Sequence, residues 1–379
     1  YAGMFNGCTS LVNAPVLPVT TLAEYCYFWM FSNCTSLVKA PELPATTLAS
    51  NCYTSMFYGC SSLNEVHCQM PSTISSEDIP TYTGDGSASS LAQWLEGVSP
   101  TGTFYTNADA NWPSGSSGIP TGWTRDPVGY DIAKPLTFRA TQDGSTVKLT
   151  KTGSPTGSFQ TSRDGGNTWE DYTPDTAISL NTGDEVSFRA KADRTSAQTL
   201  DNYFQFMMGG KIEAWHNVMS LYRTNDFVTY DTATDYSFYQ LFYGCTSLTK
   251  APALPATTLA QYCYSDMFRD CTALTKAPAL PATTLAPKCY ANMFNGCALL
   301  TKAPALPATA LADYCYQNMF RDCISLVNAP ALPATTLAQS CYSSMFFGCT
   351  SLTKAPALPA TTLATSCYLG MCHGCTALS

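Results

Sequence analysis

The sequence predicts an α+β repeat fold: two solenoid blocks of 26-residue repeats, separated by a capping segment and a small all-β sandwich. Two observations lead to this prediction. A pattern of the form C-Y-x-x-M-F-x-x-C-x-x-L, followed by A-P-x-L-P-A-T-T-L-A, occurs nine times in total. Within each block its copies are spaced 26 residues apart. Between the blocks, the composition shifts to Ser, Thr, Gly and Pro and then to alternating apolar and polar residues. A fixed period of this length is typical of stacked units, because one unit cannot bury its apolar face without a neighbour.

The second cysteine of the pattern sets the register of the repeats. The nine cysteines of this column are Cys8, Cys34, Cys60, Cys245, Cys271, Cys297, Cys323, Cys349 and Cys375. They place one block at residues 1–66 and the other at 245–379, and the distance between the blocks is not a multiple of the repeat length. Both ends of the chain fall inside a repeat, so we expect a piece of a longer array, with any signal or anchor outside it.

Each repeat is expected to begin with a short helix. Cys289, Met293 and Cys297 recur every four residues, as on the buried stripe of a helix. The residue before the second cysteine is always Gly, Asn or Asp, the types that tolerate a left-handed backbone and end helices. The helix is therefore expected to end there and to be followed by a strand.

The strand is expected at residues 274–279, stacked in parallel on its neighbours. Its phase is predicted to turn Ala277 and Ala279 inward, because the opposite phase would bury a lysine. The paired prolines lack an amide donor, so the strand pairing must be short. Leu285 is then expected to return to the core.

The 18 cysteines are expected to be buried free thiols. Sixteen lie in two columns whose members are eight residues apart within a repeat, about 12 Å along a helix, which is too far for a disulfide. Free cysteine packs as a small hydrophobe. Because only three histidines (His67, His216 and His373) and no C-x-x-C pair are present, no metal site and no cofactor are expected.

The repeat resembles the BspA-type leucine-rich repeats of bacterial surface proteins. The resemblance lies in M-F-x-x-C-x-x-L-x-x-A-P-x-L-P, set against the family's A-F-x-x-C-x-x-L-x-x-I-x-I-P, and it covers nine repeats. The period is a few residues longer than the usual one, and alanine replaces bulkier strand residues. The resemblance implies leucine-rich-repeat blocks in a secreted or cell-surface protein associated with adhesion, without catalytic residues.

Residues 67–126 are predicted to cap the first block. The segment holds Trp94, Trp112 and Trp123 on a polar background, and its S-S-L-A-Q-W-L-E-G run predicts a short helix. An array needs its open apolar end covered, and tryptophans suit that purpose. The alternative interpretation is that these rings stack on sugars.

Residues 127–208 are predicted to form a small antiparallel β-sandwich, immunoglobulin-like in broad architecture. Short alternating segments are separated by D-G, D-G-G and T-G-D turns, and no cysteine is present. Residues 209–244 are then expected to cap the start of the second block. Within the sandwich, Ser162 to Trp169 match S-x-D-x-G-x-x-W, a hairpin motif of sialidase propellers. Because it occurs once, we interpret it as a turn closed by Asp164 and packed by Trp169.

Composition and motifs argue against several classes of function. Only 12% of residues are charged and the net charge is −8, which disfavours a nucleic-acid binder. No stretch approaches the roughly 20 apolar residues of a membrane span. None of the common catalytic motifs is present. The acidic cluster Asp226, Asp231 and Asp235 is interpreted as a solvated loop in preference to a calcium site, and His216 as a capping residue in preference to a base. The chain is therefore not expected to be an enzyme.

One column of the repeat is a candidate ligand-binding site. The lysines that share this position are Lys39, Lys250, Lys276, Lys302 and Lys354, with Asn13 and Asn328 at the same place. Stacked coils would align them on the strand face, where an acidic glycan or protein could bind. The simpler alternative is that duplication copied a solubilising lysine. The tyrosine column is uniform, which favours packing over recognition.

These observations predict a non-catalytic, secreted or cell-surface adhesion protein. Its partner would be a host or bacterial surface protein, another cell or a glycan, bound through the solenoid face. A bacteriophage tail or receptor-binding component is the alternative, since repeat arrays with immunoglobulin-like modules are found there as well. A carbohydrate-active enzyme is a third, weaker hypothesis.

Overall fold

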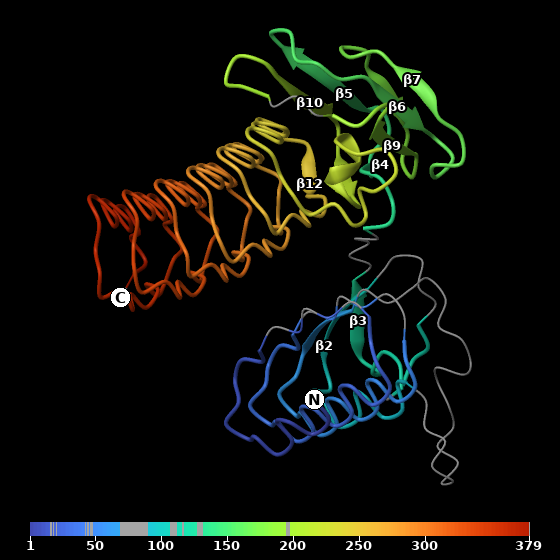
Figure 1. Ribbon diagram of the computed structural model, residues 1–379, viewed down its shortest axis with the longest axis vertical. Helices are drawn as coiled ribbons and strands as arrows, with labels where there is room; N and C mark the ends of the chain where they lie inside the picture. The colour runs from blue at the N-terminus through green and yellow to red at the C-terminus, as the bar shows by residue number, and fades with distance from the viewer. Residues whose placement is uncertain are drawn as a thin grey trace. The chain divides into compact units, whose positions relative to one another are not determined.

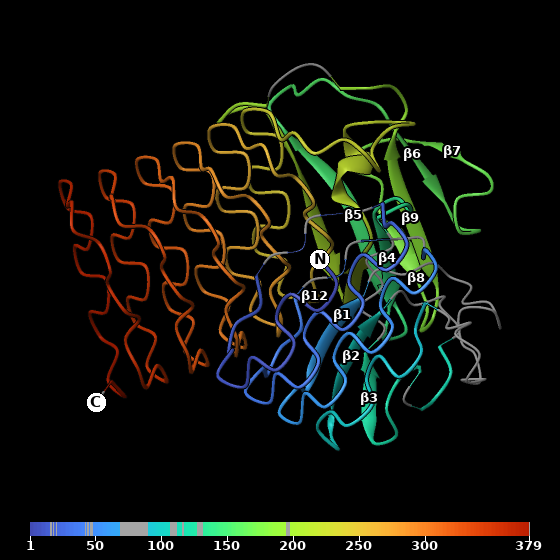
Figure 2. The same cartoon turned by 60° about the horizontal axis from the view of Figure 1, so that its bottom comes forward.

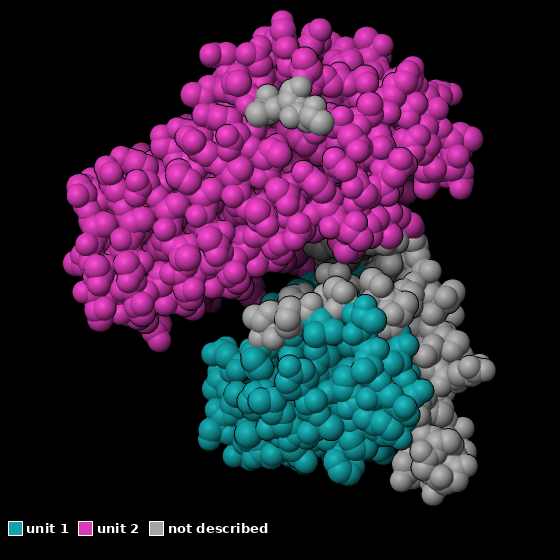
Figure 3. All heavy atoms as spheres, viewed as in Figure 1, with its two compact units in different colours: residues 1–131 teal, residues 132–379 magenta. Residues whose placement is uncertain are grey.

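The computed structural model describes residues 1–15, 17, 19, 21–41, 43, 45, 48–68, 90–106, 112–115, 117–126, 132–194 and 198–378. They belong to two compact units, unit 1 (residues 1–131) and unit 2 (residues 132–379), coloured separately in Figure 3. The finer predicted boundaries within these units stay predictions. The strands are β1 (Glu65–Cys68), β2 (Gly102–Thr106), β3 (Trp123–Asp126), β4 (Thr137–Ala140), β5 (Ser145–Thr152), β6 (Phe159–Ser162), β7 (Glu170–Tyr172), β8 (Ile178–Leu180), β9 (Glu185–Ala190), β10 (Tyr203–Gly209), β11 (Ile212–Trp215) and β12 (Leu248–Lys250).

The segment expected to be helical is a run of tight turns, so the predicted α+β solenoid is wrong. The described residues contain no α-helix, only the four-residue 3₁₀ helix η1 (Val218–Leu221), and hence no helix that is long and apolar enough to cross a membrane. In one repeat, Lys288, Asn292 and Gly296 have φ of +54°, +54° and +76°. A left-handed residue at every fourth position interrupts the hydrogen-bond ladder of an α-helix. The repeats are therefore coils of turns and extended chain, and they do not close into a helix-and-strand solenoid.

Backbone hydrogen bonds in this turn segment alternate between a coil and its neighbour. The Phe294 amide donates to the Met319 carbonyl of the next coil at 2.9 Å, whereas the adjacent Met293 amide donates to the Tyr290 carbonyl of its own coil at 3.3 Å. The same alternation recurs from coil to coil. Successive coils of residues 237–378 consequently stack in register, with the curled segments along one edge and the extended segments along the other (Figures 1 and 2).

The extended side of each coil pairs with its neighbours through very few residues. In the second block only β12 is long enough to be a strand, and beyond it single parallel bridges connect the coils. Prolines without amide donors account for this short pairing, as the sequence predicts. The bridges in the lysine column join Lys276 to Lys302, Lys302 to Asn328 and Asn328 to Lys354.

The predicted phase of the extended segment is correct at one alanine and wrong at the other. Ala277 packs against the core, but Ala279 is exposed, and the neighbouring Leu280 is buried in its place. A larger apolar side chain removes more surface from water, so leucine occupies the inward position. Leu285 is buried, as predicted.

Unit 1 ends in a three-stranded parallel sheet, in the order β1-β2-β3. The helix predicted across residues 89–97 is wrong, because Gln93 and Gly97 have φ of +51° and +74° and the described part of this segment is one more turn segment. Trp94 occupies its inward face, fully buried and stacked on Tyr53 with ring centroids 6.2 Å apart. The coil stack thus continues beyond the last regular repeat.

Unit 2 begins with two sheets that face each other across an aromatic core. One sheet has the order β10-β5-β8 and the other β12-β11-β4-β9-β6-β7. Phe206 of β10 contacts Phe138 of β4 and Phe188 of β9, with centroids 4.6 and 5.2 Å apart. Because β11 pairs in parallel with β12, the larger sheet runs directly into the first coil of the second block. The immunoglobulin-like assignment of this region stays a prediction.

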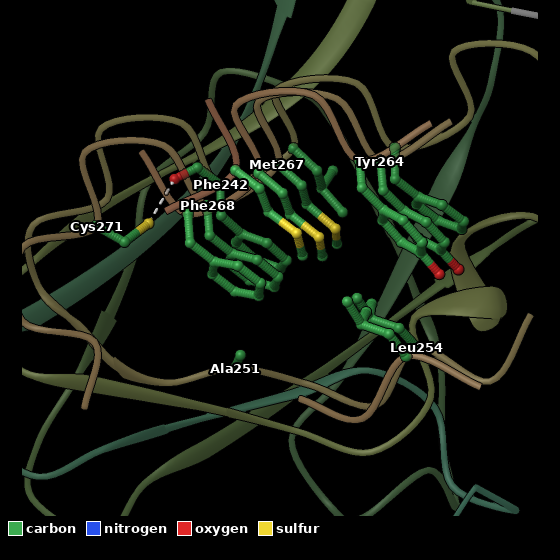
Figure 4. Packing of buried hydrophobic residues seen from close by; sticks show 14 of the residues in the cluster. Phe242, Ala251, Leu254, Tyr264, Met267, Phe268 and Cys271 are labelled. Carbon is green, nitrogen blue, oxygen red and sulfur yellow. Dashed lines mark hydrogen bonds between the residues drawn. The ribbon is translucent and has the colours of Figure 1, made fainter. Parts of the chain in front are cut away.

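Two columns of aromatic rings form the core of the second block (Figure 4). Consecutive phenylalanines stack almost parallel, as Phe242 does on Phe268 with centroids 5.4 Å apart. Phe206 of β10 stacks on Phe242 at 5.5 Å and so starts the column where a preceding coil would stand. Offset aromatic pairs of this kind contribute about 0.5–1.5 kcal/mol each beyond their burial.

Candidate binding surfaces

Three of the five predicted lysines form an exposed row in unit 2. Lys276, Lys302 and Lys354 are exposed and share the bridged position, with Asn328 between the last two. Parallel pairing sets neighbouring chains about 4.8 Å apart. We call these three lysines the lysine row. Its members lie on one edge of the coils, one and two coil spacings apart.

The other two predicted lysines have specific partners. Lys39 Nζ lies 2.9 Å from Glu65 Oε1 in unit 1. Lys250 Nζ lies 3.1 Å from the centre of the Trp215 ring, and the Trp215 indole N–H donates to Glu213 at 3.1 Å. An ion pair and a cation–π contact both neutralise a cation locally. Lys39 and Lys250 therefore each serve a contact within their own unit.

The cysteines have a structural role that the sequence did not reveal. All 18 are free and 15 are buried; Cys8 is exposed, and Cys26 and Cys372 are partly buried. In the second column seven of the nine thiols donate to the carbonyl of the phenylalanine one coil earlier, as from Cys271 Sγ to Phe242 O at 3.0 Å (Figure 4), and Cys245 donates to Phe206 O of β10. Burial raises the pKa of Cys60 and of Cys263 to about 12. These thiols are protonated donors, not nucleophiles.

The three tryptophans of the predicted cap are packed away from solvent. Trp94, Trp112 and Trp123 are at most 8% exposed, and the first two stack at 5.5 Å. Each indole N–H has an acceptor within the unit, at 3.2, 2.6 and 2.7 Å respectively. Their ring faces are occupied, so the alternative that they stack on sugars does not fit this geometry.

The motif at Ser162 to Trp169 is a β-hairpin turn, as interpreted from the sequence. It joins the antiparallel strands β6 and β7. Asp164 accepts from the Thr168 amide at 2.9 Å and from the Ser162 hydroxyl at 2.7 Å, and these hydrogen bonds, above all those from Thr168, hold its pKa well below the usual range. Trp169 packs under the Arg189 guanidinium, 4.1 Å from its ring centre. Every group of the motif thus serves the turn.

The acidic residues of the connector are held apart by separate partners. Asp226 forms a two-point ion pair with Arg223, Asp231 accepts from the Thr257 hydroxyl, and Asp235 accepts from the Gln261 amide. Each carboxylate is thus held by a different partner, Asp226 within its own segment and the other two by the following coil. Across the described parts of the chain, no three His, Cys, Asp or Glu side chains come together as a metal site requires.

Sequence reasoning missed a groove on the turn side of unit 1. It has a volume of about 330 Å³ and runs across the turn segments of four successive coils. Trp29 and Tyr58, 48% and 39% exposed, supply its aromatic surface. We call it the Trp29 groove; its lining is Asn6, Trp29, Ser32, Asn33, Ser55, Tyr58 and Gln93. The available signal was a tryptophan at a repeat position that is otherwise small or polar.

Comparison with known families agrees with this coil architecture. The family described as BspA type leucine rich repeat region matches six copies, over residues 2–81 and 237–372, which is more than half of the chain. The chain belongs to the BspA-type leucine-rich repeat family. Repeats of this family are typical of surface adhesion and binding proteins and are generally non-catalytic. No curated protein and no solved structure shows a significant match.

Proposed function

We propose that this chain is a non-catalytic adhesion or binding protein, secreted or displayed at a cell surface, that recognises an acidic partner through the lysine row. The family supports the general class, since BspA-type repeats are typical of such proteins. The observation behind the finer proposal is the bridging of Lys276 to Lys302 and of Asn328 to Lys354, which aligns exposed cations along one edge.

Charge explains why an acidic partner suits this edge. The chain carries a net charge of −8, which disfavours an anionic partner except where cations gather. The three lysines of the row, aligned by the bridges between coils, gather cations in this way. A sulfated or carboxylated glycan, or an acidic segment of a host protein, matches a row of this kind.

Charge reversal of the row tests the proposal. Lys276→Glu, Lys302→Glu and Lys354→Glu are combined, and binding to sulfated glycans and to immobilised matrix proteins is measured at several salt concentrations. Exposed ion pairs contribute about 0.2–1 kcal/mol each, so we expect roughly tenfold weaker binding and a flatter salt dependence.

A matched variant controls for net charge. Lys148, Lys151 and Lys211 lie in unit 2 away from the coil row, in β5 and beside β11, and their combined change to glutamate alters the net charge equally. This control variant is expected to bind as the unchanged protein does. Equal losses in the two triple variants, or no loss in the row variant, would refute the role of the row.

A further inference from the structure

Trp29 differs in size and polarity from every residue at the same position in the other coils. The equivalent residues in the other coils are Gly3, Ser55, Gln93, Gln240, Asp266, Asn292, Asn318, Ser344 and Gly370. Every one of them has a positive φ, and Trp29 has φ of +55°. Gly, Asn and Asp tolerate a left-handed backbone, whereas other residues, Trp29 among them, adopt it at a penalty of about 1–2 kcal/mol.

Packing does not offset this penalty. Trp29 is 48% exposed, and its described ring contact is with Phe28, at 4.7 Å and tilted by 32°. The Trp29 amide donates to the Thr54 carbonyl of the next coil at 3.1 Å, so the backbone is held in place while the indole reaches solvent. Tyr25 of the same coil is also left-handed and exposed, so what distinguishes Trp29 is the indole itself, which lines the groove at a position that is otherwise small or polar.

The groove beside Trp29 offers uncharged hydrogen-bonding groups. Its lining combines two aromatic rings with amide and hydroxyl side chains and contains no charged residue. The side chains of Asn6, Ser55, Tyr58 and Gln93 make no hydrogen bond to another residue that the structure describes. Donors and acceptors of both kinds are therefore available to a ligand.

The corresponding face of the first coils of the second block differs, because polar side chains there bind one another. Asp266 accepts from Ser265 at 2.8 Å and from Arg269 at 3.2 Å, and the Gln240 amide donates to the Tyr239 hydroxyl at 2.9 Å. Side chains engaged in this way must exchange internal partners before they can bind a ligand. Availability of the polar groups therefore distinguishes the Trp29 groove from the equivalent surface of these first coils.

We infer that the Trp29 groove binds a neutral pyranose unit of a glycan. A flat indole face suits the C–H face of a sugar ring, and neutral amides that both donate and accept suit vicinal hydroxyl groups. A volume of about 330 Å³ lies at the small end of ligand sites, which fits one or two sugar units. The absence of charge from the lining selects a neutral ligand, so this site differs from the lysine row in both place and chemistry.

Trp29→Ser is the decisive variant, because it installs the residue that the next coil uses at this position, Ser55. The full chain and the variant are tested for binding to an array of neutral oligosaccharides, with titration calorimetry on any that bind. We expect at least a tenfold loss of affinity with little change in the unfolding midpoint, since Ser55 occupies the same left-handed position in the next coil. Gln93→Ala is expected to weaken the same binding by several-fold.

Tyr25→Ser is the matched control. Tyr25 is 44% exposed, belongs to the same coil and also has a left-handed backbone, but it does not line the groove. Its variant should bind neutral glycans normally. The inference is overturned if no neutral glycan binds, if Trp29→Ser binds undiminished, or if Tyr25→Ser loses as much. The triple glutamate variant of the lysine row should leave this binding intact, which separates failure here from failure of the proposed function.

Discussion

The environment of the Tyr290 phenol predicts that a change to phenylalanine will stabilise the protein. Its ring is 1% exposed and stacks between Tyr264 and Tyr316, at 5.9 and 5.8 Å. Within the described residues its hydroxyl has no hydrogen-bond partner. A buried polar group without a partner destabilises the native state by about 1–3 kcal/mol relative to its hydrated, unfolded form.

Tyr290→Phe removes that hydroxyl and keeps both ring contacts. We expect the free energy of unfolding of unit 2 to rise by about 1–3 kcal/mol, which raises its Tm by roughly 2–4 °C per kcal/mol for a unit of this size. Urea titration and thermal melting, followed by far-UV circular dichroism, measure the change. The urea m-value should not change, because the two proteins bury nearly the same surface.

Tyr172→Phe is the matched control with the opposite expected sign. The Tyr172 hydroxyl accepts from the Leu149 amide at 3.0 Å and donates to the Thr176 carbonyl at 2.6 Å. Its removal leaves a buried amide unpaired and should destabilise unit 2 by about 1–3 kcal/mol. A lower midpoint for Tyr290→Phe would show that the Tyr290 hydroxyl has a partner, and the reasoning from its burial would be refuted.

Three further predictions concern the thiols and the end of unit 1. At pH 8 in the folded protein, a thiol reagent should modify Cys8 first and Cys263 only after unfolding, because burial raises the Cys263 pKa to about 12 and leaves it protonated; peptide mass mapping measures this. Cys297→Ala removes the thiol that donates to Phe268 O at 3.1 Å and should destabilise unit 2 by about 1–2 kcal/mol in urea titration, whereas no change would assign the thiol no structural role. Trp94→Ala should lower the stability of unit 1 by about 3–5 kcal/mol and leave the melting of unit 2 unchanged, and calorimetry that shows both transitions shifting would contradict this.

The sequence predicted the register of the coils and the burial of 15 of the 18 thiols, but it misidentified the local backbone. In the C-Y-x-x-M-F-x-x-C pattern, apolar residues return every four positions, whereas an α-helix repeats every 3.6. Over nine residues the two periods differ by less than one position, so a helical stripe and a run of turns are hard to distinguish. The left-handed residues at Lys288 and Tyr314 hid the difference, because neither lysine nor tyrosine signals a positive φ.

The alignment of the lysine column was predictable from the sequence, whereas the contacts of its members were not. Repeat register alone placed the five lysines in one column. Their partners come from elsewhere in the chain: Glu65 reaches Lys39 from the following coil, and Trp215 reaches Lys250 from β11. Contacts between different segments of this kind are set by tertiary packing, which no pattern within a repeat records.

Columns that face inward and columns that face outward are under different physical constraints in a stack of coils. An inward ring such as Phe294 touches an identical ring on each side, at 5.6 and 5.7 Å, so a change in one coil disturbs two interfaces at once. Uniform inward columns therefore follow from packing alone. An outward side chain touches its neighbours weakly and can vary without loss of stability, so a departure from its column reflects what the surface does. Trp29 is such a departure on the described surface of unit 1, and a ligand that covers the indole would account for it.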